Sequence, residues 1–154
     1  MQRSATSASP TEVDAFVAIA SDLVGVALRS IAPEDVTVPQ FRLLLALHKQ
    51  GPVSSAQMAR TLELAPSSVT RLADRLVVSG LIERGGIPEH RGVVTLSLLP
   101  AGSALVDRVL QRRIDELSAV LDCLAPSVRA GGAEALRTVH DLLGENRSIG
   151  SVVL

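Results

Sequence analysis

Aromatic residues are nearly absent from this sequence of 154 residues. They make up 1% of it: Phe16 and Phe41, with no tryptophan or tyrosine. Proteins that bind single-stranded nucleic acid or sugars by stacking need exposed aromatic rings, so both classes are disfavoured. Hydrophobic residues still account for 47% of the chain. The sequence therefore predicts one folded domain with an aliphatic core.

Cysteine and long apolar runs are also scarce. The single cysteine, Cys123, excludes an internal disulfide and fits a reducing compartment. It lies between Leu121 and Leu124, which favours a packing residue over a redox sensor. No apolar run has the length of a membrane span, and residues 1–11 lack the apolar core of a signal peptide. We expect a cytoplasmic protein that does not bind membranes.

A strong excess of positive charge is missing as well. The formal net charge is -1, and residues 53–99 carry five arginines against four acidic residues. Proteins that bind nucleic acid through their total charge are strongly basic. Any contact with DNA must therefore be local.

Helix signals fill the first half of the chain. Apolar residues at helical spacing follow Glu12, and Thr37 and Ser54 each precede a glutamine by three residues, the signature of a capping box. Pro66 is typical of a first helical turn and Gly80 of a helix end. These signals predict helices at about 12–31, 37–49, 54–62 and 66–79.

Alternation replaces the helical period after Gly80. It predicts short strands at 81–84 and 93–98, with Val94, Leu96 and Leu98 on one face. The connecting loop is longer than the usual hairpin loop of about two to five residues, which is typical of functional loops.

A long helix is predicted from Pro100 to about Leu124. Its leucine and isoleucine residues step by four and three, the spacing of a coiled-coil seam, which predicts a homodimer interface. Gly131 and Gly132 are expected to break the pattern before a last helix that ends at Gly144. The seam consists of Leu110, Ile114, Leu117, Leu121 and Leu124.

The predicted fold is mainly α-helical with a small β-hairpin. The order of helix, helix, turn, helix and hairpin is that of a winged helix-turn-helix lobe, here flanked by long N- and C-terminal dimerisation helices. We divide the chain into a flexible arm (1–11), a dimerisation helix (12–36), the lobe (37–99), C-terminal dimerisation helices (100–145) and a tail (146–154).

Residues 66–79 would be the recognition helix. Small hydroxyl residues at its start allow close approach to a major groove, and Arg71 one turn later could pair with guanine. A polar outer face is, however, common to every amphipathic helix. The expected DNA contacts in the helix-turn-helix are Ser54, Ser55, Ser67, Ser68, Thr70, Arg71 and Arg75.

The run from Pro39 to Gly102 resembles the MarR family of bacterial transcription regulators. The segments that carry the resemblance are "SSAQMARTLELAPSSVTRLADRLVVSGLIER" and "EHRGVVTLSLLPAG". In that family an Asp-x-Arg element marks the wing tip and a Thr-x-x-Gly turn enters the long helix. Here Glu89-His90-Arg91 and Leu99-Pro100-Ala101-Gly102 stand in their places, two mild departures.

The resemblance implies a wing whose tip touches DNA. His90 and Arg91 would contact the duplex, with Arg91 in a narrow minor groove. Glu89 and Arg84 would stabilise the wing, Glu89 as the partner of Arg84 or Arg91.

The family's behaviour implies a homodimeric repressor that binds a pseudo-palindromic operator in double-stranded DNA. A small-molecule effector would release it from the DNA. The expected ligand-binding residues are Phe16, Phe41, Arg42 and His48, which could equally be ordinary core and surface residues.

Two other classes of function were weighed. A winged-helix protein–protein interaction module without DNA binding is compatible with the near-neutral charge. An enzyme is disfavoured, because the sequence has neither a phosphate-binding Gly-rich loop nor a Gly-x-Ser-x-Gly elbow. The three histidines and the cysteine show no metal-ligand spacing, so we expect no metal and no cofactor.

Overall fold

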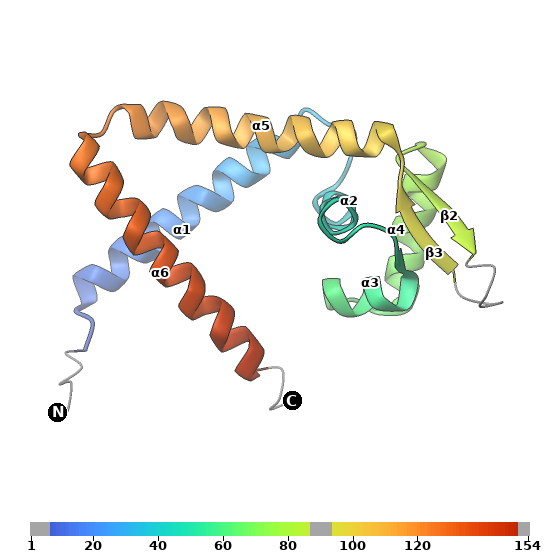
Figure 1. Ribbon diagram of the computed structural model, residues 1–154, viewed down its shortest axis with the longest axis horizontal. Coiled ribbons are helices and arrows are strands. Elements are labelled where there is room, and N and C mark those ends of the chain that lie inside the picture. Colours follow the sequence, from blue (N-terminus) through green and yellow to red (C-terminus); the bar gives the residue numbers. More distant parts are fainter. Residues whose placement is uncertain (1–6, 87–93, 151–154) are drawn as a thin grey trace. The chain divides into compact units, whose positions relative to one another are not determined.

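The computed structural model describes residues 7–86 and 94–150, with side chains to residue 144 except that of Gly86. These residues form six helices and three short strands, and Figure 1 shows their arrangement along the chain. The mainly helical fold with a small antiparallel sheet agrees with the predicted fold class. The helices are α1 (Pro10–Ile31), α2 (Val38–Gln50), α3 (Ser55–Leu62), α4 (Pro66–Val78), α5 (Pro100–Asp122) and α6 (Pro126–Gly150), and the strands are β1 (Val53–Ser54), β2 (Ile82–Gly86) and β3 (Val94–Leu98).

Capping boxes begin the first two helices. At α2 the Thr37 hydroxyl accepts a hydrogen bond from the Gln40 N–H at 3.4 Å, and the Gln40 side chain accepts one from the Thr37 N–H at 2.7 Å. This box confirms the sequence prediction. Ser9 and Glu12 form the same box at α1, which therefore begins at Pro10, two residues before the predicted start.

The turn between α3 and α4 is tight. Glu63 ends α3 in the left-handed conformation, with φ of 56°. The N–H of Leu64 then donates to the carbonyl of Ala59 at 3.0 Å, which reverses the chain. Three residues later α4 begins, so the two helices form the predicted helix-turn-helix.

The sheet has three strands rather than the two that the sequence predicted. β3 lies in the middle, and both β1 and β2 pair with it in antiparallel fashion. Leu96 faces Val53 on one side and Arg84 on the other, and it is fully buried. Val94 was predicted to share that buried face, but 46% of it is exposed at the end of the strand.

The core is aliphatic, as the composition indicated, and it lies inside the lobe. Phe41 is its one aromatic member. Each helix of the lobe and the first turns of α5 contribute side chains that water does not reach. The largest are Phe41, Leu43, Leu44, Leu47, Met58, Val69, Leu76, Ile82, Leu96, Val106 and Val109.

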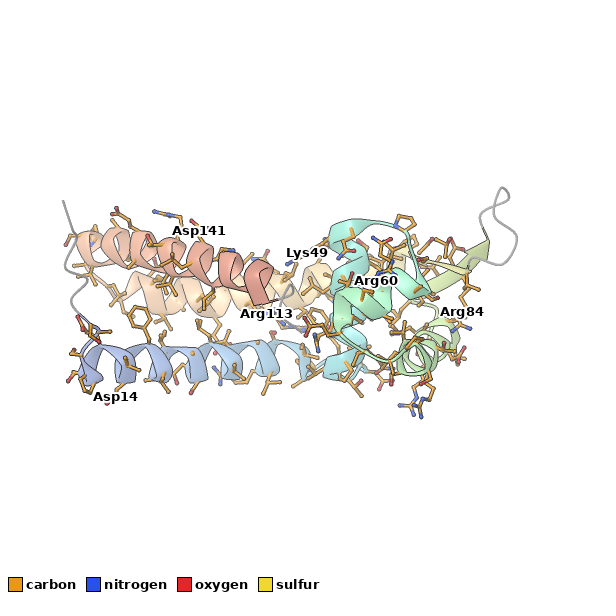
Figure 2. The ribbon with its side chains drawn as sticks, turned by 90° about the horizontal axis from the view of Figure 1, so that it is seen from below. Asp14, Lys49, Arg60, Arg84, Arg113 and Asp141 are labelled. Atoms are coloured by element: carbon orange, nitrogen blue, oxygen red, sulfur yellow. The ribbon has the colours of Figure 1, made fainter. Side chains whose placement is uncertain are left out.

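Three arginines of α5 hold the C-terminal end of α1. Arg108 donates to Glu34 at 2.8 Å, and Arg112 pairs with the same carboxylate and with the Ser30 carbonyl. Arg113, labelled in Figure 2, donates to the Ser30 hydroxyl at 2.8 Å. The Glu34 side chain is only 9% exposed. Chiefly because Arg108 donates to it, the pKa of Glu34 lies below its ordinary value, although burial acts in the opposite direction.

The last helix corrects a prediction. Gly131, Gly132 and Gly144 were expected to break or end it, but all three lie inside α6. Glycine weakens a helix by about 1 kcal/mol relative to alanine without blocking the helical backbone. The adjacent Gly131 and Gly132 therefore do not suffice to interrupt this helix of 25 residues. Among the described helices, none combines the length and the apolar composition that a bilayer span requires.

Candidate nucleic-acid interface

One face of α4 is buried and the other is free. Val69, Ala73 and Leu76 are fully buried. Leu72, on the same side of the helix, is only partly buried. The opposite face has hydroxyl and arginine side chains that could meet a partner. Of the predicted contact residues on α4, Ser67, Thr70, Arg71 and Arg75 are exposed and Ser68 is half-buried.

Local hydrogen bonds hold the start of α4. The Thr70 hydroxyl donates to the Pro66 carbonyl at 3.1 Å, and Arg71 Nε donates to the Ser67 carbonyl at 3.4 Å. Arg71 thus lies back along its own first turn, beside small side chains. Small residues at a helix start let the backbone approach base edges closely.

Ser54 and Ser55 form hydrogen bonds within the lobe. The Ser54 hydroxyl caps α3 by accepting from the Gln57 N–H at 3.1 Å, and the Ser55 hydroxyl donates to the Val94 carbonyl at 3.5 Å. Both residues are half-buried. Their expected contact with DNA would have to compete with these internal bonds.

The hairpin joins α4 through Arg84. Its Nη1 lies 2.8 Å from the Asp74 carboxylate, and its Nη2 donates to the Thr70 carbonyl at 3.0 Å. The expected partner, Glu89, lies outside the described residues, as do His90 and Arg91. In the described part of the chain Arg84 therefore stabilises the helix side of the hairpin.

Two charged residues of this surface were missed by the sequence reasoning. Arg60 is exposed on α3, the first helix of the motif, which crosses the phosphate backbone in helix-turn-helix proteins. Its place on the polar face of α3 could have revealed it. Asp74 is exposed on α4 and pairs with Arg84, a contact that the sequence does not reveal.

The four expected ligand residues lie on two helices, Phe16 on α1 and Phe41, Arg42 and His48 on α2. Phe16 lines an open hollow of about 620 Å³ along α1, and His48 lines another of about 450 Å³ beside Pro100. Phe41 is buried beneath the Arg113 guanidinium, 5.2 Å from its ring centre. Arg42 donates to the Leu62 carbonyl at 3.4 Å.

The coiled-coil seam of α5 has two parts. Leu110 packs against the lobe core, so it supports the lobe and is only partly available to a second chain. Further along, Leu117 is half-buried, and Ile114, Leu121 and Leu124 are 55%, 45% and 40% exposed.

Cys123 is exposed in the single chain, with its thiol 3.4 Å from the Ala119 carbonyl, so its role as a packing residue stays a prediction. Within residues 7–86 and 94–150, no three histidine, cysteine or acidic side chains gather as a metal site would require.

Known proteins match this arrangement. The MarR family model matches residues 34–91. The transcriptional repressor MdtR of Bacillus subtilis is 36% identical over 86 residues, 56% of each chain. The chain spans about half the length of the curated relatives that it matches. The names of these relatives are those of transcriptional regulators, which agrees with the expectation that the chain is not an enzyme.

Solved structures extend the likeness to the flanking helices. RV1404 from Mycobacterium tuberculosis is 32% identical with a TM-score of 0.83, covering 91% of this chain and 97% of that one. A MarR family protein from Bacillus stearothermophilus is 25% identical with a TM-score of 0.78, covering 87% and 94%. Together with the family model, the match along nearly the whole chain shows that this protein belongs to the MarR family.

Proposed function

We propose that this protein is a homodimeric, sequence-specific DNA-binding transcription regulator. The observation that carries the proposal is the exposed face of α4, with Ser67, Thr70, Arg71 and Arg75 opposite a buried face. A second helix of a helix-turn-helix with this division is suited to a major groove. Arg71 would pair with guanine through its two N–H groups, and the wing would enter the adjacent minor groove.

The proposed dimer rests on the apolar side chains that the long helices leave exposed. Val13, Phe16 and Val17 of α1 and Leu142 and Leu143 of α6 are each about half exposed. Exposed apolar surface of this kind on each helix marks an interaction site. A second copy with two-fold symmetry would cover it and would place two recognition helices on a pseudo-palindromic operator.

Repression is the proposed outcome of binding, because MdtR is named as a repressor. Release by a small-molecule effector remains a prediction from the family resemblance. Of its four expected residues, Phe41, Arg42 and His48 lie on α2 and Phe16 lies on α1.

The proposal is tested by selecting duplexes from a random pool and measuring two variants on a selected and a scrambled site. Arg71→Ala should cost about 1–3 kcal/mol on the selected site and much less on the scrambled one. Arg91→Ala should weaken binding to both and lower the log–log salt slope by roughly one unit per lost contact, counted twice in a dimer.

Arg137→Ala, an exposed arginine of α6, is the control of equal charge. If the wild-type protein selects no duplex, the chain is not a sequence-specific DNA-binding protein. An interaction module that binds another protein through the same lobe would then be favoured. If Arg91→Ala leaves affinity and salt slope unchanged, the hairpin is not a wing that contacts DNA.

A further inference from the structure

The guanidinium of Arg84 contacts α4 at two points. One N–H group reaches the Asp74 carboxylate at 2.8 Å, and another reaches the Thr70 carbonyl at 3.0 Å. The two acceptors are one helical turn apart, so the planar fork of a single arginine spans a full turn of the helix. Arg84 itself is fixed in β2, opposite the buried Leu96 of the central strand.

These two contacts constrain the rotation of α4 about its own axis. The buried side of the helix packs through Val69, Ala73 and Leu76, which are aliphatic side chains without directional bonds. An ion pair to Asp74 and a hydrogen bond to the Thr70 carbonyl, both on one side of the helix, favour one rotation of α4, which the aliphatic packing alone does not. The rotation decides where Arg71, next to Thr70 in the chain, points.

Arg84 also occupies the single carboxylate of α4, that of Asp74. Asp74 follows Arg71 by three residues, a spacing at which oppositely charged side chains on a helix pair. A free Asp74 would attract the Arg71 guanidinium and repel DNA phosphates. Because Arg84 holds Asp74, Arg71 makes its only described hydrogen bond to the Ser67 carbonyl instead.

We infer that Arg84 is a positioning residue for DNA recognition, which fixes the rotation of α4 and keeps the Asp74 carboxylate away from Arg71. This inference rests on the proposed function. It assigns Arg84 a role without contact to DNA, unlike the arginines that would touch bases or phosphates. The charge of Arg84 is balanced by Asp74, so it should release no counterions when DNA binds.

The test is a double variant that removes both charges, Arg84→Gln with Asp74→Asn. Its matched control is Arg129→Gln with Asp122→Asn, which removes another Arg–Asp pair, 3.1 Å apart, that joins α5 to α6. Both doubles keep the net charge of the wild type. Affinities for a selected and a scrambled duplex are measured at several salt concentrations, and thermal unfolding confirms that each variant folds cooperatively.

Loss of positioning should weaken binding to the selected duplex by roughly ten-fold, within the range for coupled neighbours. Binding to the scrambled duplex and the salt slope should match those of the control. A slope lower by roughly 0.9 per subunit on both duplexes would show that Arg84 contacts phosphate instead. Wild-type affinity on both duplexes would also overturn the inference.

The single variant Arg84→Lys sharpens the test. Lysine keeps the charge but cannot reach two acceptors with a fixed fork. We expect the wild-type salt slope together with a lower ratio of selected to scrambled affinity. An unchanged ratio would mean that charge alone is required, against the proposed role.

Hydrogen exchange on the free protein separates this inference from the proposed function. In the Arg84→Gln, Asp74→Asn double variant, amides of α4 and β2 should exchange faster than in the wild type, and those of α2 should not change. Unchanged amide exchange in α4 would show that Arg84 does not hold this helix in place, whatever the protein binds. If the wild type selects no duplex, DNA recognition fails, while the exchange result still decides whether Arg84 holds α4.

Discussion

The lobe and the long helices of this protein are built on different principles. All of the largest fully buried side chains lie between Phe41 and Val109, in the lobe and the adjoining part of α5. Helix α1 buries only Ser30 and Ile31 at its C-terminal end. In α6, none of the residues from 126 to 144 is buried. The lobe therefore has its own core, whereas these two helices do not bury their apolar residues within one chain.

This difference in burial implies that the lobe and the long helices are stabilised in different ways. Burying an aliphatic side chain contributes about 1.5–3 kcal/mol, and the lobe gains this many times over. A long helix with a half-exposed apolar stripe gains little of it, and isolated helices are marginal in water. The long helices should therefore depend on the proposed second chain, and the lobe should not.

The largest effect is expected from a charge in the α5 seam. Leu117→Arg would place a guanidinium where the proposed partner helix packs, at a cost that two adjacent chains cannot offset. We expect monomeric or insoluble protein and no binding to a selected duplex. Analytical ultracentrifugation measures the outcome, and a fully dimeric variant would show that the seam lies elsewhere.

A pair of leucine truncations compares the two regions directly. Leu76→Ala in the lobe removes a fully buried side chain and should cost about 2–5 kcal/mol of unfolding free energy. Leu142 on α6 is 55% exposed in the single chain, so Leu142→Ala should cost less than about 1 kcal/mol when the protein is dilute.

Varying the protein concentration shows whether a second copy of the chain covers α6 or leaves it exposed. If a second copy covers Leu142, the cost of its truncation should rise as dimers form, whereas that of Leu76→Ala should stay constant. Denaturant unfolding at two protein concentrations measures both. Equal behaviour of the two variants would contradict the contrast between lobe and helices.

The sequence predicted what local chemistry determines. The helix-turn-helix could be located from the caps at Thr37 and Ser54, from Pro66 and from the turn before it. Each of these signals acts within a few residues. Strand β1 was missed, since two residues are too few to show alternation. The break at Gly131 and Gly132 was wrong because a glycine costs a helix energy without forbidding it.

Long-range contacts were beyond the reach of such signals. The link from Arg84 to Asp74 and that from Arg112 to Glu34 join residues whose spacing follows no helical or strand period. They depend on how elements pack in three dimensions. For α4, the sequence identified which residues face outward. It did not reveal that an arginine of the hairpin contacts that helix.

A smaller effect is expected at Glu34, where the lobe region meets α1. Because the pKa of Glu34 is lowered in the folded chain, its ionised form adds stability above its ordinary pKa, and this is lost as the pH falls through the lowered value. Glu34→Gln should cost about 1–2 kcal/mol at neutral pH, and the cost should shrink below about pH 4.

The neighbouring Asp35→Asn is the control, since Asp35 is exposed. It should change stability little at any pH. Urea unfolding at several pH values measures both variants. A cost of Glu34→Gln that is the same at pH 3 and pH 7 would contradict a role for its charge.

The smallest effect concerns the glycines that α6 tolerates. An added Cβ at Gly131 meets no atom within 4 Å, so Gly131→Ala should stabilise the protein by about 0.5–1 kcal/mol through helix propensity. Gly102 in α5 is the opposite case, because a Cβ there would lie 2.2 Å from the Leu81 carbonyl oxygen, and Gly102→Ala should destabilise. Denaturant unfolding compares the two. If Gly131→Ala also destabilises, a second chain must approach α6 at that glycine, since the single chain leaves the space open.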